Sequence, residues 1–160
     1  MAWVHCSMIT ITNRQRTFPC KSERLELFMQ ELLNVLNYPD FDIGILLTTN
    51  KTIRRYNKQF RHKDKATDIL SFSYHDDLIP GKRIKIHTEE DKNLGDLIIS
   101  LEYVHKDALL RKISLEERLI ILLVHGVCHL LGYDHETDSQ WRSMRAKEAF
   151  LLRKVSPRAL

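Results

Sequence analysis

The sequence LIILLVHGVCHLLGYDHE, residues 119–136, combines a long apolar run with three histidines. His125 and His129 are four residues apart, so their imidazoles lie on the same face of a helix. Gly132 follows them and can adopt the left-handed conformation that ends a helix. The chain can then turn back and bring His135 to the same point. We therefore predict a buried helix, a sharp turn and three imidazoles around one centre.

Three neutral nitrogen donors with a fourth position left open are typical of a catalytic zinc site. A single histidine on an apolar helix is more often a hydrogen-bonded core residue, and two at helical spacing can arise by chance. Three of them, with a helix-ending glycine before the third, favour one Zn²⁺ ion per chain. Its predicted ligands are His125, His129 and His135. Nickel would also accept three imidazoles.

The spacing from His125 matches the HExxHxxGxxH pattern of metzincin metalloproteases. Those proteases carry their general base, a glutamate, directly after the first histidine, whereas this chain has Gly126 there. We interpret Gly126 as leaving open space beside the metal and the missing carboxylate as an argument against a peptidase. A metal held by three uncharged ligands keeps its full charge and can lower the pKa of bound water to about 7. A phosphodiester suits that charge better than a peptide does.

The composition is that of one soluble globular domain, with 160 residues, a net charge of +4 and a pI near 9.0. Residues 51–65 carry seven basic side chains against one acid, Asp64, so the local charge of +6 exceeds that of the whole chain. Such a run is either a solvated surface or a phosphate-binding surface, since arginine can grip a phosphate through two parallel hydrogen bonds.

The cysteines have no short spacing and form no disulfide framework or cysteine-rich zinc module, which favours a reducing interior. They are Cys6, Cys20 and Cys128. The N-terminal sequence lacks the charged and apolar segments of a signal peptide. The longest apolar run is too short to cross a bilayer. We expect a cytoplasmic protein with no membrane partner.

Hydrophobic periodicity predicts alternating strands and helices around the histidine-bearing segment. Strands are predicted over residues 8–12, 41–48, 68–74 and 94–100, and helices over residues 23–37, 51–59, 101–112 and 138–153. Ser22 and Asn50 are expected to cap the first two helices. Ser114 begins a capping-box pattern that starts the histidine-bearing helix.

Residues 75–93 are polar and contain Pro80-Gly81, so they form either a loop or a hairpin arm. In the last helix we expect four side chains to face inward: Trp141, Met144, Ala149 and Phe150. Residues 154–160 are expected to form a frayed tail. No repeat or linker divides the chain, which predicts one domain over residues 1–160.

Three segments together carry a resemblance to a known family. They are HGVCHLLGYDH at residues 125–135, Arg61 followed by KDKATDILSF at residues 63–72, and LGDLIIS at residues 94–100. These segments resemble the motifs of the YbeY endoribonucleases, bacterial factors that mature ribosomal RNA. The resemblance extends from about Phe41 to Phe150.

The resemblance implies a single-domain α+β fold, with a small mixed sheet packed with helices around a central metal-bearing helix. It implies a hydrolase: a zinc-dependent, single-strand-specific endoribonuclease. Family substrates are precursor ends of ribosomal RNA, notably the 3′ end of the small-subunit RNA, and defective small subunits. The implied partners are single-stranded and ribosomal RNA, the small subunit and its assembly factors. Carried onto this chain, the catalytic residues are Arg61, His125, His129 and His135.

The chain departs from the family pattern at three positions: Cys128 replaces a common leucine, and Ala66 and Ser73 replace common prolines. None of these changes removes a metal ligand. We interpret Cys128 as a small core residue, with a redox-active or metal-adjacent thiol as the alternative. The carboxylates considered as partners that orient the histidines are Asp68, Asp96 and Asp134.

Two other functions stay open at this point. One is a metallopeptidase of metzincin type, which would need a carboxylate from elsewhere in the fold. The other is an RNA-binding ribosome-assembly factor whose metal is purely structural. Within the nuclease hypothesis, either water or the RNA 2′-hydroxyl can be the nucleophile.

Overall fold

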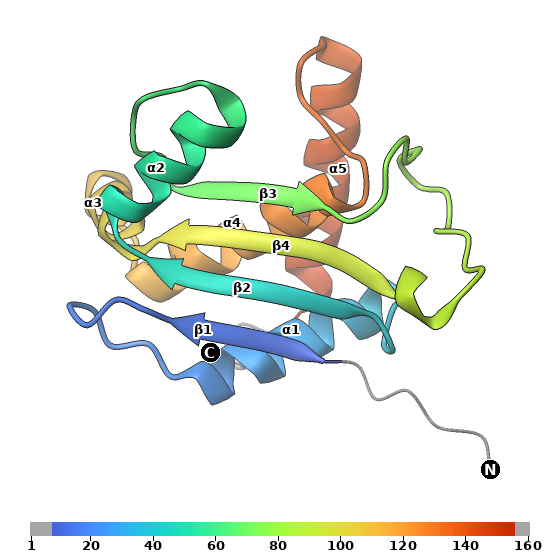
Figure 1. Ribbon diagram of the computed structural model, residues 1–160, viewed down its shortest axis with the longest axis horizontal. Helices are drawn as coiled ribbons and strands as arrows, with labels where there is room; N and C mark the ends of the chain where they lie inside the picture. The colour runs from blue at the N-terminus through green and yellow to red at the C-terminus, as the bar shows by residue number, and fades with distance from the viewer. Residues whose placement is uncertain (1–7, 156–160) are drawn as a thin grey trace.

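The computed structural model describes residues 8–155 and contains a four-stranded sheet with helices on both faces (Figure 1). The strands are β1 (Ile9–Asn13), β2 (Asp42–Thr48), β3 (Ile69–Ser73) and β4 (Asn93–Ser100), in the order β1-β2-β4-β3. β2 pairs in parallel with β1 and β4, whereas β3 runs antiparallel to β4. The small mixed sheet of the predicted α+β fold is therefore confirmed.

The two faces of the sheet are covered differently. The helices are α1 (Ser22–Val35), α2 (Asn50–Arg61), α3 (Leu101–Arg111), α4 (Leu115–Leu130) and α5 (Asp138–Lys154), with one 3₁₀ turn, η1 (Glu89–Asp91). α1 and α4 lie behind the sheet in Figure 1, and α5 packs against both of them. On the other face α2 covers only β3 and β4, through Ile53, Leu70 and Ile98.

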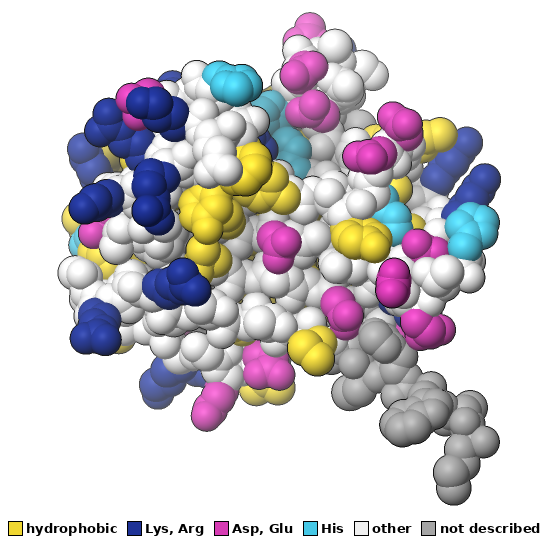
Figure 2. All heavy atoms as spheres, in the orientation of Figure 1, with side chains coloured by type: hydrophobic (Ala, Val, Ile, Leu, Met, Phe, Trp, Pro, Cys, Tyr) yellow, Lys and Arg dark blue, Asp and Glu magenta, His cyan; other side chains and the backbone are white. Residues whose placement is uncertain are grey.

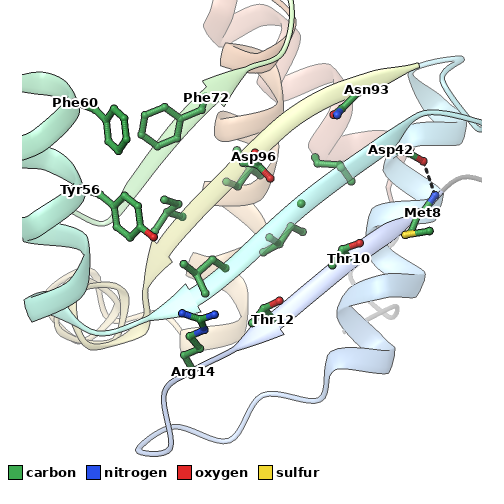
Figure 3. Close-up of a pocket in the computed structure, with 16 residues that line it drawn as sticks. Met8, Thr10, Thr12, Arg14, Asp42, Tyr56, Phe60, Phe72, Asn93 and Asp96 are labelled. Carbon is green, nitrogen blue, oxygen red and sulfur yellow. Dashed lines mark hydrogen bonds between the residues drawn. The ribbon is translucent and has the colours of Figure 1, made fainter. Parts of the chain in front are cut away.

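This partial cover leaves a groove of about 630 Å³ along β1, β2 and β4. Figure 3 shows Phe60 from α2 and Phe72 from β3 at one side of the groove, with Asp96 near its middle. The two aromatic rings meet edge to face, with their centroids 5.3 Å apart. This groove thus lies on the face of the sheet opposite to α4.

α4 begins as predicted but the other two proposed caps are wrong. The hydroxyl of Ser114 accepts a hydrogen bond from the backbone N–H of Glu117 at 3.0 Å. Ser22 and Asn50 are instead the first residues inside their helices, and the preceding residues make no side-chain cap. The amide oxygen of Asn50 accepts a hydrogen bond from the Ser100 hydroxyl at 2.8 Å, so this side chain ties α2 to the end of β4.

The segment between β3 and β4 is a loop and not a hairpin arm. Ile84 is buried, and its backbone N–H donates to the Tyr38 hydroxyl at 3.1 Å. Ile86 is exposed, and η1 follows it. Ile84 and the partly buried Leu78 therefore anchor this loop to the core without forming a strand.

The inward face of α5 differs from the predicted one. Met144 is buried as expected, but Trp141, Ala149 and Phe150 are exposed. Leu151 is the second buried residue of α5 and lies seven positions after Met144. Seven residues make about two helical turns, so Met144 and Leu151 lie on the same face and define the inward face of α5. The hydrophobicity of Trp141 and Phe150 therefore does not show which face of α5 is buried.

The C-terminal end of α5 extends further than predicted. Lys154 still belongs to α5 and Val155 is buried in the core, so these two residues are part of the fold. The rest of the predicted frayed tail, residues 156–160, lies outside the described residues. Over the described range, every helix falls short of the length and apolarity needed to cross a membrane.

Gly126 lies where α4 presses against the sheet. A Cβ atom at this position would lie 2.7 Å from Ile69 Cδ1 and 2.8 Å from Leu97 Cδ2. The interpretation that Gly126 leaves open space beside the metal is therefore wrong. Glycine allows close packing of α4 on β3 and β4, and a glutamate at this position would have to enter the apolar core.

Replacing Gly126 by valine should destabilise the fold. The two branched methyl groups would overlap Ile69 and Leu97, and overpacking of this kind typically costs about 1–3 kcal/mol. Thermal and urea unfolding would measure the loss. Ala149→Val, the same kind of change on the exposed face of α5, should alter stability by less than about 0.5 kcal/mol. Equal effects of the two substitutions would contradict this account of Gly126.

Candidate metal centre

The three histidines of residues 125–135 converge as the sequence predicts. His125 and His129 project from α4, and His135 follows the turn after it. One ring nitrogen from each residue lies within 4.8 Å of the other two. The ring centroids are 4.6, 5.1 and 5.6 Å apart. A segment of eleven residues therefore supplies all three imidazoles.

Gly132 makes the turn that brings in His135. Its φ of +83° is the left-handed conformation predicted for a helix-ending glycine. Its N–H donates to the carbonyl of His129, and the N–H of Tyr133 donates to that of Cys128, both at 3.0 Å. This pair of bonds is a Schellman motif. A Cβ atom on Gly132 would lie 2.7 Å from the backbone oxygen of Leu78, so the turn also needs glycine for space.

The spacing of the first two ring nitrogens suits a tetrahedral metal. The Nε2 atoms of His125 and His129 are 3.2 Å apart. Two imidazole nitrogens bound to one zinc ion in tetrahedral geometry are separated by about 3.3 Å. Within residues 8–155, no further histidine, cysteine or carboxylate belongs to this group. The donors thus fit a metal with three protein ligands and an open position.

Glu148 of α5 orients the first of these histidines. Its Oε1 lies 2.7 Å from Nδ1 of His125, which leaves Nε2 of the same ring facing His129. Burial by itself raises the pKa of Glu148, but the hydrogen bond and charge of His125, with Arg145 nearby, hold that pKa below its ordinary value. A carboxylate on the outer nitrogen of a ligating histidine fixes its tautomer and ring orientation.

His129 is held in the neutral form that a metal ligand requires. Burial, together with the nearby His125 and His135, lowers the pKa of His129 to about 4. The ring is therefore uncharged at neutral pH, and its nitrogen lone pair is available.

The carboxylates considered as partners of the histidine rings are engaged with other groups or lie on the far face of the sheet. Asp68 pairs with Arg118 at 3.2 Å, and Asp134 accepts the backbone N–H of His135 at 2.8 Å. Asp96 lines the groove on the far face of the sheet (Figure 3). Glu148 was missed, although an acidic residue four positions after the buried Met144 signals a partly buried carboxylate that needs a partner.

Cys128 lies in the core beside this centre and takes no part in it. Its side chain is fully buried, and burial raises the pKa of its thiol to about 12. A thiol in this state is unreactive at neutral pH. The interpretation of Cys128 as a small core residue is confirmed.

Arg61 ends α2 and lies against the edge strand of the sheet. Its Nη2 donates to the backbone oxygen of Ser71 at 3.3 Å. Two residues further along β3, the Ser73 hydroxyl donates to the carbonyl of Leu130 in α4. β3 thus separates Arg61 from the helix that carries the histidines. Arg61 is absent from the residues that line the two pockets beside the histidines.

The basic run of residues 51–65 is partly neutralised by its own acid. Asp64 bonds Arg54 at 2.8 Å and Lys58 at 3.1 Å, and these hydrogen bonds lower the pKa of Asp64 to about 2. Figure 2 shows Lys and Arg side chains gathered over α2. α2 therefore presents a positive surface next to β3.

Two pockets adjoin the histidines, with volumes of about 290 Å³ and 590 Å³. Both are lined by His125, Arg145 and Glu148. His135 and Trp141 also line the smaller pocket, and Asp68, Arg111 and Arg118 line the larger one. The candidate centre is therefore open to solvent on the side of α5.

Comparison with known proteins identifies relatives along nearly the whole chain. Residues 10–156 match the family model described as Endoribonuclease YbeY. The human Endoribonuclease YbeY is 31% identical over 150 residues, covering 94% of this chain and 89% of its own. The protein of the same name from Geobacter metallireducens is 35% identical, covering 88% and 90%. That of Persephonella marina is 44% identical, covering 70% and 68%.

A solved structure has the same fold. It is the solution structure of the Thermotoga maritima protein TM1509, with a TM-score of 0.54, 22% sequence identity, and coverage of 90% of this chain and 89% of its own. With the family model and curated relatives above 30% identity over most of their length, the resemblance seen in the sequence is confirmed. The chain belongs to the Endoribonuclease YbeY family.

Proposed function

We propose that this protein is a single-domain, zinc-dependent endoribonuclease that cleaves single-stranded RNA. Its proposed substrate is ribosomal RNA, at the 3′ end of the small-subunit RNA and in defective small subunits. Its proposed partners are the small subunit and its assembly factors, in the cytoplasm. The family relationship supports the reaction, and the convergence of His125, His129 and His135 is the single observation that carries the proposal.

The chemistry requires a positive centre that accepts an anionic substrate. A zinc ion held by the three histidines would polarise a phosphate oxygen and lower the pKa of water. The chain keeps His129 neutral and fixes the ring of His125 through Glu148. Arg61 lies across the edge strand β3 from the histidines, and from there it would add a permanent positive charge for RNA that crosses this edge to the centre. Either water or the RNA 2′-hydroxyl can attack.

A peptidase is the first competing function. A peptidase would need a carboxylate from elsewhere in the fold, and Glu148 is a carboxylate beside the centre. Its Oε1 contacts Nδ1 of His125, the ring nitrogen that does not face His129. This carboxylate therefore lies on the outer side of the ligand and is already engaged. A phosphodiester remains the favoured substrate.

An assembly factor with a structural metal is the second competing function. Structural zinc sites are closed by four protein ligands. The described residues bring three donors together, and pockets open beside two of those histidines. This arrangement favours a site that also receives substrate.

Replacing His129 by alanine should abolish both metal binding and RNA cleavage. One of the three donors is lost, and the purified variant should contain far less zinc than the one ion per chain expected of the wild type. Metal analysis and a cleavage assay on matched single-stranded and duplex RNA measure both effects. If the wild type cleaves casein but leaves RNA intact, and His129→Ala abolishes the casein cleavage, the protein is a peptidase instead.

Replacing Arg61 by alanine should lower kcat by about 10²–10³-fold, as for removal of one charge-stabilising donor, with zinc content unchanged. Arg55→Ala, which removes an exposed arginine from the same helix, is the matched control and should retain most activity. If Arg61→Ala weakens only salt-dependent RNA binding, and the wild type shows no turnover, the assembly-factor function gains support.

Replacing Glu148 by glutamine should lower zinc affinity by about 10–100-fold, because the amide holds the imidazole of His125 less firmly than the carboxylate does. Competition with a chelator measures the affinity. The melting temperature of the metal-free protein separates this effect from a loss of folding. Unchanged zinc affinity would show that Glu148 does not orient the ligand.

A further inference from the structure

Three residues of α5 align along the side of the helix that borders the metal centre. Trp141, Arg145 and Glu148 are spaced by four and then three residues, which places them on one face. The Arg145 guanidinium carbon lies 5.7 Å from the centre of the Trp141 ring. Glu148 contacts His125 at 2.7 Å. A continuous row therefore runs from an exposed indole to a predicted metal ligand.

Trp141 is 53% exposed, although tryptophan has the largest apolar side chain. Met144, three residues further along α5, is buried instead. Trp141 lines the pocket of about 290 Å³ together with His125 and His135. The exposed indole thus forms a flat apolar wall directly beside the predicted metal ligands.

Arg145 stands between the two pockets, since it lines both of them. Arg111 and Arg118 also line the larger pocket, but both are bound to Asp107. Within residues 8–155, the ion pair of Arg145 is a long one, 3.9 Å to Glu148. Most of its five N–H donors are therefore available to an anion.

We propose that Trp141 and Arg145 form a nucleotide subsite for single-stranded RNA beside the metal centre. The indole stacks on one base, and the guanidinium binds a neighbouring phosphate. An aromatic ring next to a cationic donor recognises any unpaired base through its flat face, whereas bases inside a duplex are already stacked. The subsite rests on the proposed nuclease function and accounts for its preference for single strands.

Steady-state cleavage of a labelled single-stranded RNA by the zinc-loaded protein tests the subsite. Trp141→Ala should raise KM about tenfold or more, the effect expected for one lost base stack, and leave kcat within about twofold. Trp141→Phe should restore most of the affinity, because it keeps an aromatic face. Arg145→Gln should also raise KM and should reduce the salt dependence of binding by about one phosphate contact.

α5 offers matched controls away from the pockets. Phe150 lies near Lys147 and Lys154, with the two ammonium groups 5.5 Å and 6.0 Å from its ring, so Phe150→Ala removes a similar aromatic–cation contact. Arg142→Gln removes an exposed arginine that hydrogen-bonds the Asp138 carbonyl. Both controls should leave KM unchanged. If Trp141→Ala behaves like Phe150→Ala, the pair is only a helix-surface contact and the subsite is refuted.

Fluorescence anisotropy of labelled RNA separates failure of the subsite from failure of the nuclease function. Cleavage by the wild type with no change of KM in Trp141→Ala refutes the subsite alone. If the wild type binds RNA without cleaving it, and Trp141→Ala weakens that binding, the subsite is supported and the nuclease function is refuted. A wild type that neither binds nor cleaves RNA overturns both.

Discussion

The contact of α4 with the sheet at Gly126 sets the direction in which the histidines point. Successive residues of an α-helix are rotated by about 100°, so fixing residue 126 against Ile69 and Leu97 fixes the whole helix phase. His125 and His129 then fall together on the flank of α4 that faces α5 and the following turn. A side chain at position 126 would make the ends of Ile69 and Leu97 shift, and a large one would also press α4 away from the sheet. The close approach of α4 to the sheet, and with it the direction of the histidines, is therefore favoured by the glycine.

A partly buried ion-pair network holds the other end of the same helix. Arg118, in the second turn of α4, contacts Asp107 of α3 and Asp68 just before β3. Burial raises the pKa of Asp107, but hydrogen bonds from Arg111 and Arg118 outweigh this effect and lower it. Removing Arg118 from this network would leave two partly buried carboxylates without their shared cation. α4 is thus fixed by charge at its beginning and by the glycine turn at its end.

The features that sequence predicted well are those that depend on local spacing. His125 and His129 share a helix face, Gly132 ends the helix and Ser114 caps it, because each relation involves residues a few positions apart. The features it missed depend on contacts across the chain. The space at Gly126 is filled by β3 and β4, and the partner of His125 comes from α5, 23 residues away. Trp141 was expected to be buried because its size suggests a core residue, but the phase of α5 follows from packing against α4 and α1.

The strand order has a consequence for how the chain acquires its structure. β2 and β3 are consecutive in sequence, yet β4 lies between them in the sheet. During synthesis β3 is complete some twenty residues before β4, so it has no partner in the sheet until β4 inserts beside β2. The surface that receives α4 exists only after that insertion, because it is formed by β3 and β4 together. In the chain the histidine-bearing helix follows β4 after only α3, so both strands on which it packs are synthesised before it.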